Sequence, residues 1–321
     1  MPGSAIGPSE FVSLVSDTAI YSGGGDGDVG GLSKVDAGPI AEVDGTFYTL
    51  FVASGDRSGG GSENALYSAT SLDGSSWTVS DSPTVLSGFE GGAELMVRSL
   101  IPLDDGSWVA YLHLAVAVGE YGNYRYDWSI QRAVAEDPAG PWTLDDEANL
   151  LPGGAGSWDS NGVLNPSVVF TGDRWMMFYT GFPSKEDRDG TASNFTSSAL
   201  GLATSDDGIS WTKLGDPVFT GDASVGWEEG SISRTEVLFV DDQFVLLYAA
   251  RAGGTRGVAT SPNGVVWARS EANPILTTLD TPRPTIYSTS MYQGDAGIRL
   301  YVSSGGEYTT SAVYEMSLQV P

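Results

Sequence analysis

The 321-residue chain contains no cysteine, one histidine and only 15 lysine and arginine residues. Without cysteine there is neither a disulfide framework nor thiol chemistry, and a single histidine argues against a zinc site. The few basic residues stand against 41 acidic ones, giving a net charge of −26. Such a chain repels phosphate backbones, which argues against nucleic-acid binding. Because the acid is spread along the whole chain, we interpret it as a solvated acidic surface.

The sequence also lacks an apolar run of roughly 18 residues, so we expect no membrane span and no membrane partner. The first residues, "MPGSAIGPSEF", show no basic segment followed by an apolar one, so no signal peptide is visible. The compartment stays undetermined, with a secreted or periplasmic location favoured. No glycine-rich phosphate loop precedes a helix, and we expect no cofactor. The loop "SGGGDGDVGG" (22–31) carries Asp26 and Asp28, but the closing Glu of a calcium loop is missing and calcium is not indicated.

Glycine is abundant, with 43 residues, and aromatics make up 11% of the chain, which suits a turn-rich β protein. A unit of strand, turn, strand, loop, strand, Asx-Gly turn and strand recurs along the sequence. Five segments represent its second strand: "VDGTFYTLFVAS", "LDDGSWVAYLHL", "TGDRWMMFYTG", "VDDQFVLLYAAR" and "YQGDAGIRLYVSSG". Repeats of this kind, none of which buries both faces alone, are typical of a propeller.

We therefore predict an all-β fold, a five-bladed β-propeller of four-stranded antiparallel blades forming one domain over 1–321. The last unit lacks a fourth strand, and "EFVSLVSDTAIYS" near the N-terminus is expected to supply it and close the ring. The expected segments are 1–31 for the closing strand and glycine-rich loop, then blades at roughly 32–87, 88–153, 154–222, 223–277 and 278–321. A closed ring leaves only short edges, so a monomer is expected.

Three near-identical phrases carry tight turns followed by tryptophan: "SLDGSSW", "SDDGISW" and "SPNGVVW". Asp-Gly and Asn-Gly supply the positive φ that such hairpin turns need. We expect the flat tryptophan side chains to pack between neighbouring blades.

Two long phrases, "GSWDSNGVLNPSVVFTGDRWMMFYTG" and "LGLATSDDGISWTKLGDPVF", and the turn "AEDPAGPWT" carry a likeness to known proteins. In these phrases the sequence resembles the five-bladed propeller glycoside hydrolases, the family 43 and family 32 group. The resemblance covers residues 32 to 316 and is specific for the fold. It implies a site at the channel mouth with a base in blade one, a tuning Asp in blade three and an acid Glu in blade four. Glycoside hydrolysis needs two such carboxyl groups, one to protonate the leaving oxygen and one to activate water or attack.

Carried over residue by residue, the resemblance assigns Asp36 as the base. Asn165 stands where the tuning Asp is expected, and Asn can still orient a substrate. Blade four offers Glu236 or Glu229 as the acid, because strict register reaches Ser233 or Arg234 instead. The alternative for both residues is a structural ion pair, of Asp36 with Lys34 or an arginine and of Glu236 with Arg234.

Arginines occupy expected channel positions in a chain that has few of them. Register on the aromatic strands places Arg98 and Arg234 at equivalent positions, and Arg283 and Tyr287 enter from blade five. A buried arginine must be paired or await an anion, which indicates an anionic sugar as one possible ligand.

Further candidate substrate contacts are aromatic. Trp158, Trp227 and Phe89 lie in loops before inner strands and are candidates to stack on a sugar ring, with blade packing as the alternative. His113, in the apolar strand "YLHLAVAV", is included as a channel contact, with a core histidine as the alternative. Two functions stay open. The first is a glycosidase that acts on a glycan by carboxylate acid/base catalysis. The second is a non-catalytic carbohydrate-binding propeller with an arginine-lined pocket.

Overall fold

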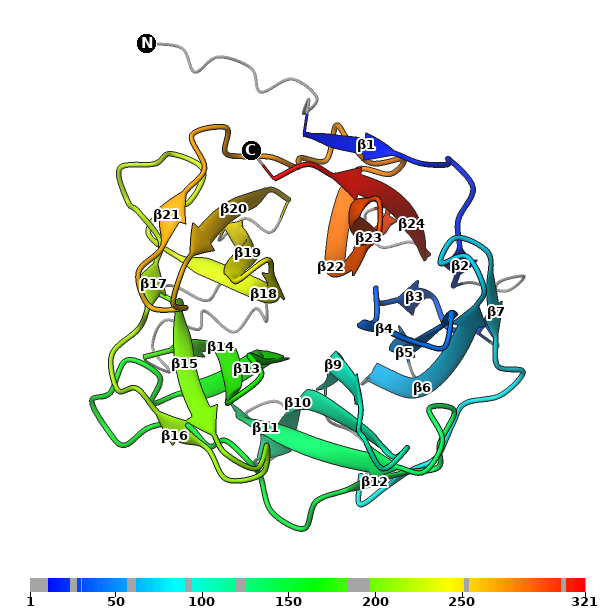
Figure 1. Cartoon of the computed structure of the whole chain (residues 1–321), viewed down its shortest axis with the longest axis horizontal. Coiled ribbons are helices and arrows are strands. Elements are labelled where there is room, and N and C mark those ends of the chain that lie inside the picture. The colour runs from blue at the N-terminus through cyan, green and yellow to red at the C-terminus, as the bar shows by residue number, and fades with distance from the viewer. Residues whose placement is uncertain are drawn as a thin grey trace.

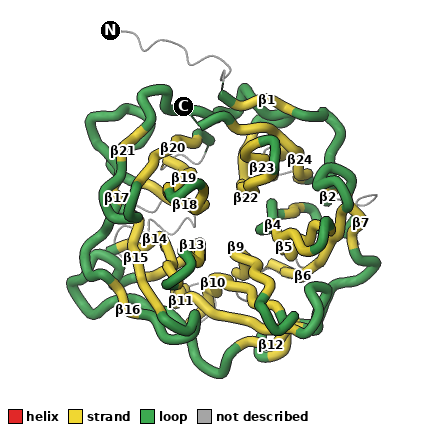
Figure 2. Tube along the Cα trace, in the orientation of Figure 1, coloured by secondary structure: helices red, strands yellow, loops and turns green. Residues whose placement is uncertain are grey.

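The computed structural model describes residues 11–23, 28–29, 31–56, 62–89, 94–118, 125–183, 197–250, 254–306 and 310–320. These ranges consist of strands and loops (Figure 2). They include no helix of the length and hydrophobicity that a membrane crossing requires. The all-β prediction is confirmed.

The strands form antiparallel groups arranged as a ring (Figure 1). The first group holds β3 (Lys34–Val35), β4 (Ile40–Val43), β5 (Thr46–Asp56), β6 (Ser62–Ser71) and β7 (Trp77–Val79). The second holds β8 (Leu86–Ser87), β9 (Glu94–Pro102), β10 (Trp108–Val118), β11 (Arg125–Ala135) and β12 (Trp142–Leu144). The third holds β13 (Gly162–Phe170), β14 (Trp175–Phe182), β15 (Ala199–Ser205), β16 (Thr212–Lys213) and β17 (Phe219–Thr220).

The fourth group holds β18 (Ile232–Val240), β19 (Gln243–Ala250), β20 (Arg256–Ser261) and β21 (Ala268–Arg269). The last holds β22 (Thr285–Gly294), β23 (Gly297–Gly305) and β24 (Ser311–Leu318), with β1 (Val12–Leu14) and β2 (Tyr21–Ser22) from the other end of the chain. The second and third groups count as one ten-stranded sheet because of a single parallel bridge between Trp128 and Gly162. We read them as separate blades, since every other pairing of their long strands stays within a group.

The ring closes as predicted. β1 pairs antiparallel with β24, with Val12 opposite Leu318, so the N-terminal segment supplies the outer strand that the last repeat lacks. β2 adds to the same strand, with Tyr21 opposite Val313. Hydrophobic layers fill the spaces between neighbouring blades: Leu50 of β5 shares one core cluster with Leu112 of β10.

The repeated Asx-Gly turns are also where predicted, and each is held by the adjacent blade. Gly74 and Gly208 both have positive φ, and their carbonyls accept hydrogen bonds from Tyr301 and Tyr111 of neighbouring blades. The turn tryptophans pack edge-on against the same tyrosines, with Trp77 6.1 Å from Tyr301 between ring centroids. The repeated phrase thus encodes an interblade contact as well as a hairpin turn.

Two equivalent loops that lead into inner strands carry a tryptophan followed by a buried acid. Trp227 stacks on Tyr248 with ring centroids 5.6 Å apart, and Glu228 is fully buried. The Glu228 carboxylate accepts from Tyr248 Oη at 2.7 Å, from Arg269 Nε and Nη2 at 2.9 and 2.8 Å, and from the N–H of Asp222 at 2.7 Å. Burial raises the pKa of Glu228, but these donors outweigh it, and the pKa lies below its usual value.

The same arrangement occurs one blade earlier. Trp158 stacks on Tyr179 with ring centroids 5.7 Å apart, and buried Asp159 accepts from Lys213 Nζ at 2.5 Å and from Tyr179 Oη at 3.2 Å. In both blades the acid joins the entry loop to the second and fourth strands. We call the set Trp227, Glu228, Tyr248 and Arg269 the blade-four clamp.

Replacement of Glu228 by alanine is expected to lower the free energy of unfolding by about 3 kcal/mol, because it leaves buried donors without their acceptor. The partner Arg269 side chain is 31% exposed and can reach water, which keeps the loss from being larger. Denaturant unfolding measures the effect. Glu229→Ala is the matched control: Glu229 is the exposed next residue, and its variant should stay within about 0.5 kcal/mol of the parent. Equal stabilities for the two variants would contradict a structural role for the clamp.

Candidate active site at the ring centre

The inner strands of four blades are irregular at the same point. The pairing register shifts beside Arg98 in β9, at Asn165 in β13, at Arg234 in β18 and at Tyr287 in β22. Asn165 and Arg234 have positive φ, 52° and 46°, which is uncommon for residues with a side chain. Bulges re-aim side chains and are over-represented next to active sites. The irregularity thus recurs in four blades, and in three of them it falls at Arg98, Asn165 and Arg234, the positions that the repeat aligned.

In blade one the corresponding stretch lies between β3 and β4 and contains Asp36. Its carboxylate Oδ1 accepts a hydrogen bond from Ser288 Oγ at 3.2 Å, and Ser288 Oγ accepts from the N–H of Ala37 at 2.9 Å. No described residue bonds to Oδ2. Burial is the largest influence on Asp36 and raises its pKa above the usual value, although Arg98, the Ser288 hydroxyl, Arg234 and Lys34 act to lower it. The carboxylate is half-buried and has one oxygen available.

Glu236 follows the bulge of β18 and is 7% exposed. Its Oε1 accepts from the N–H of Met291 at 2.5 Å, whereas Oε2 is buried and has no hydrogen-bond partner. Burial raises the pKa of Glu236 to about 7, although Arg98 and the Met291 N–H act to lower it. The nearby Ser290 hydroxyl also lowers this pKa without reaching hydrogen-bond geometry. Glu236 is thus an acid that holds its proton up to neutral pH.

The strand β22 connects these residues. Asp36 bonds to Ser288, Arg98 Nη1 donates to the carbonyl of Thr289 at 3.3 Å, and Glu236 accepts from Met291. Arg234 Nη1 donates to the carbonyl of Ile286 at 3.4 Å on the same strand. Side chains from three other blades therefore converge on six consecutive residues, 286–291. Since Arg98 acts electrostatically on both Asp36 and Glu236, the two carboxyl groups share one electrostatic environment.

Among the described residues, no ion pair joins Asp36 to Lys34, Arg98 or Arg234, and none joins Glu236 to Arg98 or Arg234. The described part of the chain thus lacks the structural ion pairs that were the alternative for these carboxyl groups, although the basic side chains still act on them electrostatically.

His113 and Asn165 are both buried, and a hydrogen bond joins them at the bulge of β13. The backbone N–H of Asn165 donates to His113 Nδ1 at 3.1 Å, and Asn165 Nδ2 donates to Thr180 Oγ1 at 3.4 Å. Burial and then Arg98 lower the pKa of His113 to about 3, so the imidazole is neutral. His113 therefore holds Asn165 in place, which differs from the substrate contact expected from sequence.

Several other sequence-derived candidates lie elsewhere. One face of Trp158 and one of Trp227 are occupied by Tyr179 and Tyr248, which assigns both rings to blade packing, and Phe89 packs against the core of blades one and two. These contacts favour blade packing, the alternative considered for the three residues, over the expected sugar platforms.

Two charged residues, Glu229 and Arg283, also lie apart from the group around Asp36 and Glu236 in which the sequence placed them. Glu229 is exposed in the turn after the clamp residue Glu228. Arg283 Nη1 donates to the carbonyl of Thr310 at 2.7 Å, outside β22. Tyr287, in contrast, lies at the bulge of β22, where Lys34 Nζ sits 5.7 Å from its ring centroid.

Sequence reasoning missed the buried hydroxyl residues of β22 and the buried Arg256. Thr289 and Ser290 are buried with unbonded hydroxyl oxygens. Burial and then Arg234 and Arg98 lower the pKa of Arg256 well below its usual value. The available signal was the run "STS" inside an otherwise apolar inner strand, since hydroxyl residues there need a reason to be buried.

The metal and calcium expectations stay untested. In the described part of the chain, no group of three or more acidic or histidine side chains could hold a metal ion. Asp26 lies outside the described residues. Asp28 is described, and its Oδ2 accepts from the N–H of Ser22 at 2.7 Å.

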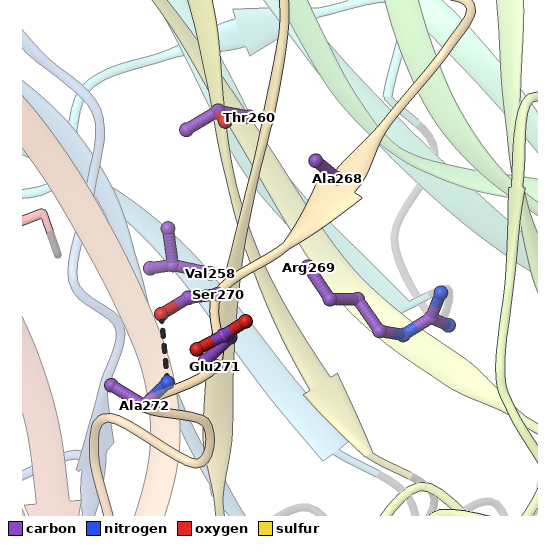
Figure 3. Close-up of a pocket in the computed structure, with 7 residues that line it drawn as sticks. All are labelled: Val258, Thr260, Ala268, Arg269, Ser270, Glu271 and Ala272. Carbon is purple, nitrogen blue, oxygen red and sulfur yellow. Dashed lines mark hydrogen bonds between the residues drawn. The ribbon is translucent and has the colours of Figure 1, made fainter.

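A separate cavity of about 400 Å³ lies at the outer edge of blade four, lined by residues 258, 260 and 268–272 (Figure 3). Its guanidinium, from Arg269, is already bound to Glu228 and to the carbonyl of Thr220. This cavity shares no residue with the group around Asp36 and Glu236.

Comparison with known proteins agrees with the architecture. No family model matches the chain. A β-1,2-mannobiose phosphorylase from Thermoanaerobacter sp. (strain X514) is 25% identical over 114 residues, covering 34% of this chain and 37% of that protein. The match thus spans little more than a third of the curated relative.

Solved structures match over nearly the whole chain. A thermostable family-43 glycoside hydrolase aligns with a TM-score of 0.65 at 14% identity, covering 91% of this chain and 95% of the other. A family 117 glycoside hydrolase from the marine bacterium Zobellia galactanivorans aligns with a TM-score of 0.63 at 14% identity, covering 96% and 90%. The chain therefore has the propeller fold seen in family 43 and family 117 glycoside hydrolases.

Proposed function

We propose that the protein cleaves glycosidic bonds at the centre of the ring, with Glu236 as the general acid and Asp36 as the second carboxylate. The observation that carries this proposal is the state of Glu236. Its carboxyl group is buried, retains its proton to about pH 7 and has one oxygen without a hydrogen-bond partner. The shared fold and the partial match to a mannobiose phosphorylase support a carbohydrate substrate.

The two carboxyl groups suit different steps. Protonated Glu236 can give its proton to the leaving glycosidic oxygen, which otherwise departs as a poor alkoxide. Burial raises the pKa of Asp36 above its usual value, and Arg98, Arg234 and Lys34 act against this rise and favour the ionised form. An ionised Asp36 can activate a water molecule or attack the anomeric carbon, as glycosidases require of their second carboxylate.

The direct test is a screen of aryl glycosides and oligosaccharides for release of reducing sugar, run with and without inorganic phosphate. We expect cleavage of at least one glycoside, with a rate that falls in acid as Asp36 is protonated and falls above about pH 7 as Glu236 ionises. Binding of a sugar without any release would contradict the enzyme proposal.

That last outcome corresponds to the second candidate, a carbohydrate-binding propeller without turnover. One observation favours it: Asn165, a neutral amide, stands where the resemblance implies a third carboxylate, and the amide is buried and held by Thr180. Its side chain cannot ionise and so cannot adjust the proton affinity of Glu236 as a carboxylate would.

A further inference from the structure

We propose that the centre of the ring is built to bind an oxyanion, either a carboxylate on the sugar itself or a free phosphate, through the guanidinium groups of Arg98 and Arg234. The inference rests on the proposed function for the position of the sugar. It adds the charge class of the ligand.

The first observation is the unused hydrogen-bonding capacity of the two arginines. A guanidinium has five N–H donors in a planar fork that matches an oxyanion. Arg98 is 7% exposed and makes one long hydrogen bond, to the carbonyl of Thr289 at 3.3 Å. Arg234 is half-buried and also makes one, to the carbonyl of Ile286 at 3.4 Å. Neither forms an ion pair with a described carboxylate.

The second observation is a set of buried polar atoms on and beside β22 that have no hydrogen-bond partner in the described part of the chain. Thr289 Oγ1, Ser290 Oγ and Glu236 Oε2 are all buried and unbonded. The backbone carbonyl of Thr289 accepts the hydrogen bond from Arg98. Ser290 is the residue before Met291, whose backbone N–H donates to Glu236. Leaving buried polar groups unpaired is costly, and each such group needs an explanation. The Ser290 hydroxyl, which acts on Glu236, and the protonated Glu236 carboxyl are donors, which suits an oxyanion.

The third observation is the local balance of charge. Besides burial, the positive charge of Arg98 acts on Arg234, and those of Arg234 and Arg98 act on buried Arg256, in each case lowering the pKa of the affected guanidinium. The carboxyl groups that face them are Asp36, Glu236 and the exposed Glu94, with Lys34 adding a further positive charge beside Asp36. Asn165 contributes no charge. Although the chain has a net charge of −26, several positively charged side chains lie together at its centre. Among them, Arg98 and Arg234 form no ion pair with a described carboxylate.

Thermal unfolding with added ligand tests the inference without requiring turnover. At constant ionic strength and pH 6, galacturonate, glucuronate and inorganic phosphate are compared with galactose and glucose. We expect at least one of the oxyanions to raise the Tm by about 5 °C at a hundredfold excess over its Kd, and the neutral sugars to have no comparable effect. The stronger ligand identifies the source of the oxyanion, either the sugar or free phosphate.

The variants Arg98→Gln and Arg234→Gln should each weaken oxyanion binding tenfold or more. Both arginines make only one long hydrogen bond, so both variants should fold. Arg174→Gln, in the exposed turn between β13 and β14, removes the same charge away from the site and should bind as the parent does. On the parent protein, phosphate and the uronate should compete for one site.

Equal binding of neutral and anionic sugars, unchanged affinity in both arginine variants, or independent binding of phosphate and uronate would each overturn the inference. Failure of the proposed function looks different: no glycoside is cleaved, yet the oxyanion still binds through Arg98 and Arg234. Conversely, cleavage of neutral glycosides with no response to any oxyanion leaves the proposed function intact and removes this inference alone.

Discussion

Replacement of Glu236 by glutamine is expected to lower turnover of an unactivated glycoside by about a thousandfold, the usual scale for losing a general acid. Glutamine preserves the shape of the side chain and can keep the contact with the Met291 N–H. It cannot donate an acidic proton to the leaving oxygen. Steady-state kinetics on the best glycoside of the screen measures the loss.

The size of the loss should depend on the leaving group. An aryl glycoside whose phenol is already a good leaving group needs little protonation, so Glu236→Gln should slow its cleavage much less. Glu229→Gln is the matched control, because Glu229 is the other acid that the sequence allowed and is exposed. A loss in Glu229→Gln with full activity in Glu236→Gln would transfer the role to Glu229.

The same variant should be more stable than the parent at alkaline pH. The pKa of Glu236 is raised by folding, so its contribution to stability is complete below the unfolded value near 4.5 and is lost as pH rises through about 7. Glutamine stays neutral throughout. The variant should therefore gain up to about 3 kcal/mol over the parent at pH 8, and the difference should vanish below pH 4.5. A variant less stable than the parent at pH 8 would contradict the burial of an ionisable carboxyl there.

Replacement of Asp36 by asparagine is expected to lower turnover by about a thousandfold or more for every substrate, aryl glycosides included. The second carboxylate acts on water or on the anomeric carbon, so a better leaving group cannot compensate for its loss. Asparagine can still accept the hydrogen bond from Ser288 Oγ, so the loop between β3 and β4 should keep its shape.

Separate measurements of sugar binding and of turnover distinguish a catalytic role of Asp36 from a role in binding the sugar. Sugar affinity of Asp36→Asn, measured by calorimetry, should stay within about tenfold of the parent while turnover is lost. Asp28→Asn, in the exposed N-terminal loop, is the control and should behave as the parent. Wild-type turnover in Asp36→Asn would remove the residue from the mechanism.

The architecture was predictable because it is encoded locally and repeated. Asp-Gly turns, alternating strands and a tryptophan after each turn recur in successive blades. The segment "EFVSLVSDTAIYS", which no repeat uses, indicated the ring closure that the pairing of β1 with β24 provides. The register of the inner strands also followed from the repeat, which aligned Arg98, Asn165 and Arg234.

The chemistry around those positions was less predictable because it depends on distant strands. The partners of Trp227 and Glu228 are Tyr248 and Arg269, which lie on the second and fourth strands of the blade, so a Trp-acid phrase looked equally suited to binding sugar. The backbone geometry of Arg234 at the bulge arises from packing and has no local signature.

The measurement that tests the central claim most directly is the pH dependence of kcat/KM for the parent and for Glu236→Gln on the same glycoside. The parent should show activity that declines above about pH 7, because Glu236 must be protonated to act. The residual activity of Glu236→Gln should lack this alkaline decline. An unchanged alkaline decline in the variant, or parental activity, would show that Glu236 is not the acid.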